Sequence, residues 1–93
     1  MSTQAVEFSV VKVERVQGRG ALVGLAIVDL DVAGVVFTLQ GVQVTRAPDG
    51  GLACKSPVWR HPAAGTWLPG VLLPPELAEA MAAEVLAAWT AQA

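Results

Sequence analysis

The chain has little charge and few side chains that bind metals or act as nucleophiles. Charged residues make up 15% of its 93 residues, and it has one cysteine, Cys54, and one histidine, His61. A lone cysteine cannot form an intramolecular disulfide, and a zinc site needs more thiolates or imidazoles than this pair supplies. A thiol enzyme also needs a third group to orient its base, and none lies nearby in the sequence. We therefore expect structural roles for Cys54 and His61, no metal or other cofactor, and no enzymatic activity.

Signals for export or membrane insertion are also missing. Residues 1–4 contain no basic region, and no apolar region of signal-peptide type follows them. The longest nearly unbroken apolar run, Ala21 to Val28, covers about eight residues, whereas a membrane helix needs roughly 20. Together with the unpaired cysteine, these features predict a cytoplasmic protein with no membrane contact.

Basic residues are too few and too scattered to form an obvious electrostatic footprint. Six basic and eight acidic residues give a net charge of −2, which weakens any nucleic-acid or membrane hypothesis. Hydrophobic residues, by contrast, make up 54% of the chain. A domain of this size hides only about two thirds of its extended-chain surface. We expect one domain over residues 1–93, with an ordered core of about 5–90, that forms a homodimer and takes no small-molecule ligand.

Apolar residues in the first two thirds alternate with the period of β-strands. A change of phase near Val10 and Val11 predicts either a β-bulge or a strand buried at one end by a second surface, and a second change at Gly41 predicts a β-bulge. Gly24 either marks a bulge or leaves room for a close neighbour such as the terminal helix. The expected strands cover residues 5–16, 21–30, 35–45 and 52–55, separated by turns at 17–20, 31–34 and 46–51.

The last third changes from strand to helix. Residues 56–70 are expected to form an ordered loop anchored by Trp59 and Trp67, and residues 71–73 to add a short strand. From Pro75 to about Thr90 the period becomes helical, with an apolar stripe made of Leu77, Met81, Val85 and Trp89. The predicted fold class is α+β: a small antiparallel meander of four or five strands closed by one C-terminal amphipathic helix.

Two weak motifs have simpler interpretations. Gly18-Arg19-Gly20 could be a phosphate loop, but it lacks the lysine and the strand-to-helix context of such loops, so a hairpin turn is favoured. Asp29 and Asp31 share a face of a strand and could bind a divalent cation together with Asp49. Carboxylates that guard a sheet edge are commoner, and no metal site is predicted.

Several basic residues fall at strand ends or in loops near a tryptophan. Arg46, Lys55 and Arg60 could hold phosphates while Trp59 stacks on a base. Alternatively these are ordinary solvated charges, and the tryptophans pack in the core or at a dimer interface. The net charge favours the second interpretation.

The order of features resembles the SpoVG family of septation regulators and their phage and proteobacterial relatives, over roughly residues 6–90. The resemblance lies in residues 20–29, in residues 35–44, in a strand ending at Ser56-Pro57, and in the closing helix with residues 85–89. It implies a small sheet packed with a C-terminal helical part, a dimer, and a regulator that binds DNA or RNA. Arg46, Lys55 and Arg60 would be the contacts.

The chain departs from the family pattern at two places. Residues 56–60 keep only part of the family's proline-serine-lysine-arginine stretch, and the helix carries only the charges of Glu76, Glu79 and Glu84. A second hypothesis is therefore a protein-interaction module whose apolar surface and tryptophans serve assembly, with neither nucleic-acid binding nor catalysis.

Overall fold

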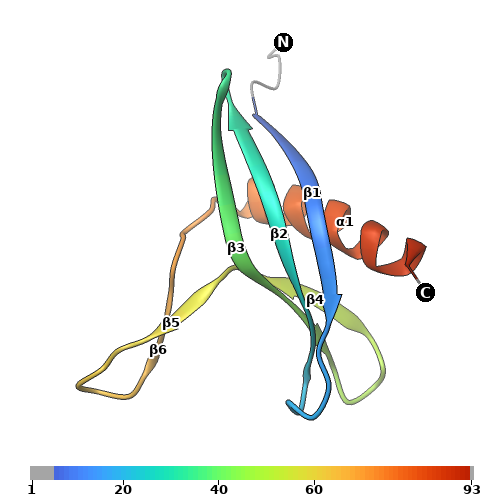
Figure 1. The fold of residues 1–93 in the computed structure, drawn as a ribbon, viewed down its shortest axis with the longest axis vertical. Coiled ribbons are helices and arrows are strands. Elements are labelled where there is room, and N and C mark those ends of the chain that lie inside the picture. The colour runs from blue at the N-terminus through green and yellow to red at the C-terminus, as the bar shows by residue number, and fades with distance from the viewer. Residues whose placement is uncertain (1–5, 93) are drawn as a thin grey trace.

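The computed structural model describes residues 6–92; Met1 to Ala5, including the expected start of the first strand, and Ala93 lie outside the described part. Six strands precede one helix: β1 (Val6–Arg15), β2 (Leu22–Val32), β3 (Val35–Arg46), β4 (Leu52–Lys55), β5 (Val58–Arg60), β6 (Trp67–Pro69) and α1 (Pro75–Ala91). Figure 1 shows a main sheet, the helix across one of its faces, and a small hairpin that projects away from both.

The main sheet is an antiparallel meander in the order β1-β2-β3-β4. Its strands are joined by tight reversals. Between β2 and β3, Ala33 and Gly34 have φ angles of 51° and 92°, and positive φ at both central positions matches the twist of a two-residue hairpin. The α+β class predicted from the sequence is confirmed.

Bulges are present at both changes of phase, so the bulge is the correct alternative near Val11. The pairing of β1 with β2 shifts between Val10 and Lys12. In β3 the register skips Gly41, because Ala26 faces Val42 while Ile27 faces Gln40, and Gly41 has a φ of 81°. Each shift returns the apolar residues on both sides of the bulge to the same face of the sheet.

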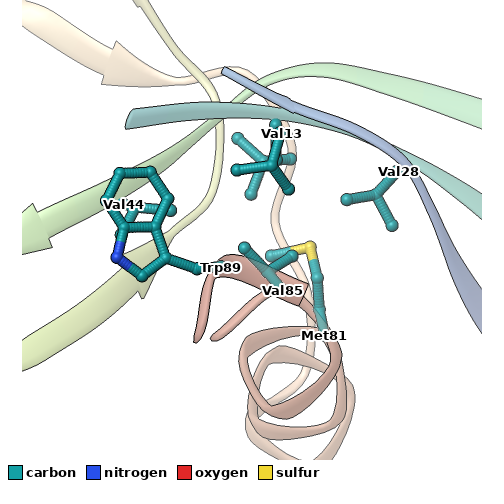
Figure 2. Close-up of a cluster of buried hydrophobic side chains, with 8 residues drawn as sticks. Val13, Val28, Val44, Met81, Val85 and Trp89 are labelled. Atoms are coloured by element: carbon teal, nitrogen blue, oxygen red, sulfur yellow. The ribbon is translucent and has the colours of Figure 1, made fainter. Parts of the chain in front are cut away.

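Helix α1 closes the core, as its apolar stripe predicts. Met81, Val85 and Trp89 are each at most 4% exposed, and they pack against buried residues of the first three strands (Figure 2). Those strand residues are Val13, Ala26, Val28, Val42 and Val44. Leu77, the first residue of the stripe, is half-buried.

Gly24 of β2 lies against the ring of Trp89 in α1. A Cβ atom built on Gly24 would lie 2.2 Å from the Trp89 ring, so this position has no room for a side chain. The pairing of β2 with β3 also shifts beside it, between Leu22 and Gly24. Gly24 therefore lies beside a register shift and also leaves room for the terminal helix, so both interpretations of this glycine are correct.

The region after β4 differs from the expectation in two ways. Residues 56–70 are not a loop anchored in the core: they contain β5 and β6, which pair antiparallel as a separate ribbon. Residues 71–73 form no strand. Pro74 and Pro75 follow at once, and proline cannot donate to a β-ladder.

The molecule is flat, with extents of 43 × 37 × 21 Å. Among residues 6–92, no helix is long and apolar enough to span a membrane.

Candidate nucleic-acid interface

Arg46 and Lys55 lie on opposite faces of the sheet. Arg46 follows buried Val44 by two residues and so shares the helix-covered face, because side chains alternate along a strand. Lys55 pairs with Gln43 and follows Cys54, which packs against the core, so it points to the opposite face.

The two residues also lie at opposite ends of the β3–β4 pairing. Arg46 pairs with Leu52, the first residue of β4, whereas Lys55 is its last. The Arg46 Nη1 donates to the Gly50 carbonyl oxygen at 3.3 Å, which ties this guanidinium to its own turn. The sequence-predicted trio therefore does not form one surface.

Arg60 lies on the projecting ribbon of residues 58–69, which we call the aromatic arm (Figure 1). In its register Arg60 faces Trp67, and Trp59 faces Leu68. Successive residues point to opposite faces, so each face of the arm carries one tryptophan. The exposed fractions are 46% for Trp59 and 65% for Trp67. These tryptophans are surface residues of the chain and not core anchors, while their alternative place at a dimer interface stays a prediction.

Hydrogen bonds fix the tip of the arm. The His61 Nδ1 accepts from the backbone N–H groups of Ala63 and Ala64, both at 3.1 Å, so the ring proton of neutral His61 sits on Nε2. The Arg60 Nε donates to the Gly65 carbonyl at 3.4 Å. The His61 ring lies 5.9 Å from the Trp59 ring at an interplanar angle of 34°. The tip is thus an ordered turn that presents aromatic rings.

The arm and its approach contain no acidic residue. Between Asp49 and Glu76 the sequence has Lys55 and Arg60 as its only full charges, so residues 50–75 carry +2 while the rest of the chain carries −4. Lys55 lies three residues before β5, at the base of the arm. Arg60 therefore lies within the aromatic arm and Lys55 shortly before it in the chain, whereas Arg46 lies on the opposite face of the main sheet from Lys55.

Cys54 has the character of a structural thiol. Burial raises its pKa from 9.0 to about 11, so at neutral pH the sulfur is protonated and weakly nucleophilic. Cys54 lies in β4 of the main sheet, whereas His61 directly follows β5 in the turn of the aromatic arm.

The three aspartates considered as cation ligands each accept a hydrogen bond from the protein. Asp29 accepts from the Thr38 hydroxyl, Asp31 from the Gly34 N–H and Asp49 from the Gly51 N–H, all at 2.8 Å. Within the described ranges they form no cluster suited to a metal ion. Their contacts are those of residues that fix strand pairing and turns.

Sequence reasoning missed two features. One is the stacking of the Arg15 guanidinium over the Trp89 ring, 4.3 Å from its centroid. The other is the pairing of residues 58–60 with residues 67–69 around the Pro-Ala-Ala-Gly turn. The glycine of that turn, Gly65 with a φ of 74°, was the available signal for a hairpin.

Comparison of the chain with protein-family models, curated proteins and solved structures gives no match in any of the three. Membership of the SpoVG family therefore remains a prediction.

Proposed function

We propose that the chain is a small regulatory protein resembling SpoVG that binds single-stranded nucleic acid through the aromatic arm. The observation that carries the proposal is the exposure of Trp59 and Trp67 on an arm without acidic residues. Bases in single strands stack on aromatic rings, and each stack contributes about 1–3 kcal/mol whatever the base. Lys55 and Arg60 would then neutralise phosphates beside the stacked bases.

The test is fluorescence anisotropy with a labelled 20-nucleotide oligothymidine and its oligouridine equivalent. Two phosphate contacts give a salt slope of about −1.4, so affinity should fall about sevenfold between 50 and 200 mM salt. Changing Lys55 and Arg60 together to alanine should flatten this slope. Changing Trp59 and Trp67 to alanine should weaken binding with little change of slope.

Arg46→Ala is the matched control, because Arg46 is an exposed arginine on the other face of the sheet. It should leave affinity and slope close to those of the unchanged chain. Absence of salt-dependent binding at micromolar protein would contradict the proposal, as would a larger effect from Arg46→Ala than from the arm variants.

A second function, self-association, is favoured by the free end of the β2–β3 hairpin. Val35, Val36 and Phe37 are each 53–59% exposed and occupy both faces of this hairpin. The chain exposes 6159 Å², whereas a compact monomer of 9.6 kDa exposes about 5,100 Å². The excess is comparable to the roughly 800 Å² that one partner buries in a standard interface.

A homodimer that buries this hairpin end would serve either a nucleic-acid regulator or a pure interaction module. Sedimentation equilibrium should give a dimer for the unchanged chain and a monomer for the Val35→Ser, Phe37→Ser double variant. Val11→Ser is the control, because Val11 is a 58% exposed valine at the β1 bulge. A monomeric unchanged chain at 100 μM would exclude this dimer, whatever the outcome of the nucleic-acid experiment.

A further inference from the structure

Strand β1 forms an edge of the main sheet, and within the described chain nothing pairs with its outer side. An edge strand presents unpaired N–H and C=O groups that another strand can use. Proteins usually block such an edge with bulges or charges. In β1 the features that block pairing lie in the second half of the strand. They are the bulge at Val11 and the ion pair of Lys12 with Glu14 at 3.7 Å. The first half, residues 6–10, has Glu7 as its only charged residue and contains no proline.

A cleft runs beside this unprotected half. It has a volume of about 520 Å³ and lies between residues 6–9 of β1 and Ala80, Ala83 and Glu84 of α1. The helix contributes two alanines here, because the larger residues of its stripe turn toward the core. The cleft therefore leaves room for the side chains of an additional strand between β1 and the helix.

The charges around this half of β1 are negative. On the face away from the helix, Glu7 lies opposite Asp31, and Asp29 lies opposite Ser9. On the helix side, Glu84 lines the cleft. No basic residue of the described chain lines the cleft. An added strand would meet carboxylates on both faces of the sheet.

We propose that an extended segment of another protein, with alternating basic and apolar residues, binds by adding to the first half of β1. Its backbone pairs with the free groups of residues 6–10, its apolar side chains enter the cleft against Phe8, Ala80 and Ala83, and its basic side chains meet Glu7 and Asp31 on the opposite face. Strand addition takes affinity from main-chain hydrogen bonds and specificity from alternate side chains. The inference does not depend on nucleic-acid binding, because the aromatic arm contributes nothing to this cleft.

The probe is a labelled hexapeptide of alternating lysine and valine, titrated into the full chain and followed by anisotropy and by amide shifts in NMR spectra. The amides of residues 6–10 should shift. A glutamate-valine hexapeptide should fail to bind. Methylation of alternate backbone nitrogens, which removes the donors of one peptide edge, should abolish binding of the lysine-valine form.

Variants of the chain test separately whether peptide binding depends on the carboxylates and whether it depends on the space in the cleft. The double change Glu7→Gln, Glu84→Gln should weaken binding by about three- to tenfold, as expected for two exposed ion pairs. Glu79→Gln, an exposed helix carboxylate outside the cleft, should change affinity by less than about twofold. Ala83→Leu should weaken binding by filling the cleft without a change of charge.

Three outcomes would overturn the proposal. One is equal binding of the basic and acidic peptides, and a second is undiminished binding of the methylated peptide. The third is a homodimer in which residues 6–10 are already protected, since a second copy would then occupy the edge. Val35 and Phe37 lie on β3 and residues 6–10 on β1, so amide protection of β1 distinguishes a failure of strand addition from a failure of self-association.

Discussion

Replacing Gly24 with alanine tests the contact between Gly24 of the sheet and Trp89 of the helix. In an ordinary strand interior this change stabilises a protein by roughly 0.5–1 kcal/mol, because glycine loses the most backbone freedom on folding. Here the new methyl would lie 2.2 Å from Cζ3 and 2.8 Å from Cη2 of Trp89, and Figure 2 shows that ring packed in the core cluster. Overpacking of this kind costs about 1–3 kcal/mol. Combining the two terms leaves a net destabilisation of up to about 2.5 kcal/mol.

A double-mutant cycle with Trp89→Leu identifies the cause. Leucine is shorter than the indole, so Gly24→Ala should cost much less in the Trp89→Leu background, with a coupling of about 1–3 kcal/mol between the positions. Trp89→Leu should restore only part of the stability lost through Gly24→Ala, because the new methyl would still lie 3.1 Å from the Glu14 carbonyl oxygen. Urea unfolding followed by circular dichroism at 222 nm gives the four free energies. A Gly24→Ala variant as stable as the unchanged chain, or zero coupling, would refute the close packing of helix on sheet.

Four further predictions concern the packing of the fold and the buried thiol. Trp89→Ala should cost about 3–5 kcal/mol in urea unfolding, because Trp89 is only 4% exposed; a loss below about 1 kcal/mol would place the ring on the surface. Gly34→Val should cost at least about 1–2 kcal/mol, because φ is 92° there; Gly51→Ala is a control in the other hairpin turn, at a glycine without positive φ. Cys54 should react with iodoacetamide at pH 8 more slowly in the folded than in the urea-unfolded chain, since burial raises its pKa to about 11. Its proton is held more tightly in the folded state, so the stability it contributes is complete below about pH 9 and is lost as pH rises toward 11; a Cys54→Ala chain should lack this part of the pH dependence.

The fold could be predicted where one residue pattern indicates both an element and an irregularity or close neighbour within it. In β1 and β3 the side-chain alternation gave the strand, and its change of phase at Val11 and Gly41 gave the bulge. At Gly24 the absence of a side chain inside an apolar run indicated a close neighbour, which is Trp89. The i+4 stripe of α1 identified the buried face of the helix. The period of the apolar residues and the positions of the glycines are local properties of the sequence, so they can be recognised without knowing which strands and helices pack together.

The candidate site could not be predicted in the same way. Strands β5 and β6 have three residues each, too few for alternation to show, and the prolines around them favoured a loop. Arg46 and Lys55 were grouped because they flank one turn and one short strand. Their separation depends on register: Arg46 pairs with Leu52 and Lys55 with Gln43, and an odd offset along β3 places the two side chains on opposite faces.

The separation of charge along the chain limits how a nucleic acid can lie on the proposed interface. Residues 50–75 carry +2 and the remainder −4, and the exposed carboxylates include Glu7, Glu14 and the three glutamates of α1. A phosphate chain that continued from the aromatic arm across the sheet or the helix would meet like charge, which costs binding free energy at separations below a Debye length of about 10 Å. Binding would therefore be confined to the few nucleotides that contact the two tryptophans and their neighbouring cations. Under the proposed function, the acidic body would limit the length of the bound strand, and a negative net charge is compatible with a local nucleic-acid site because the arm projects from the body (Figure 1).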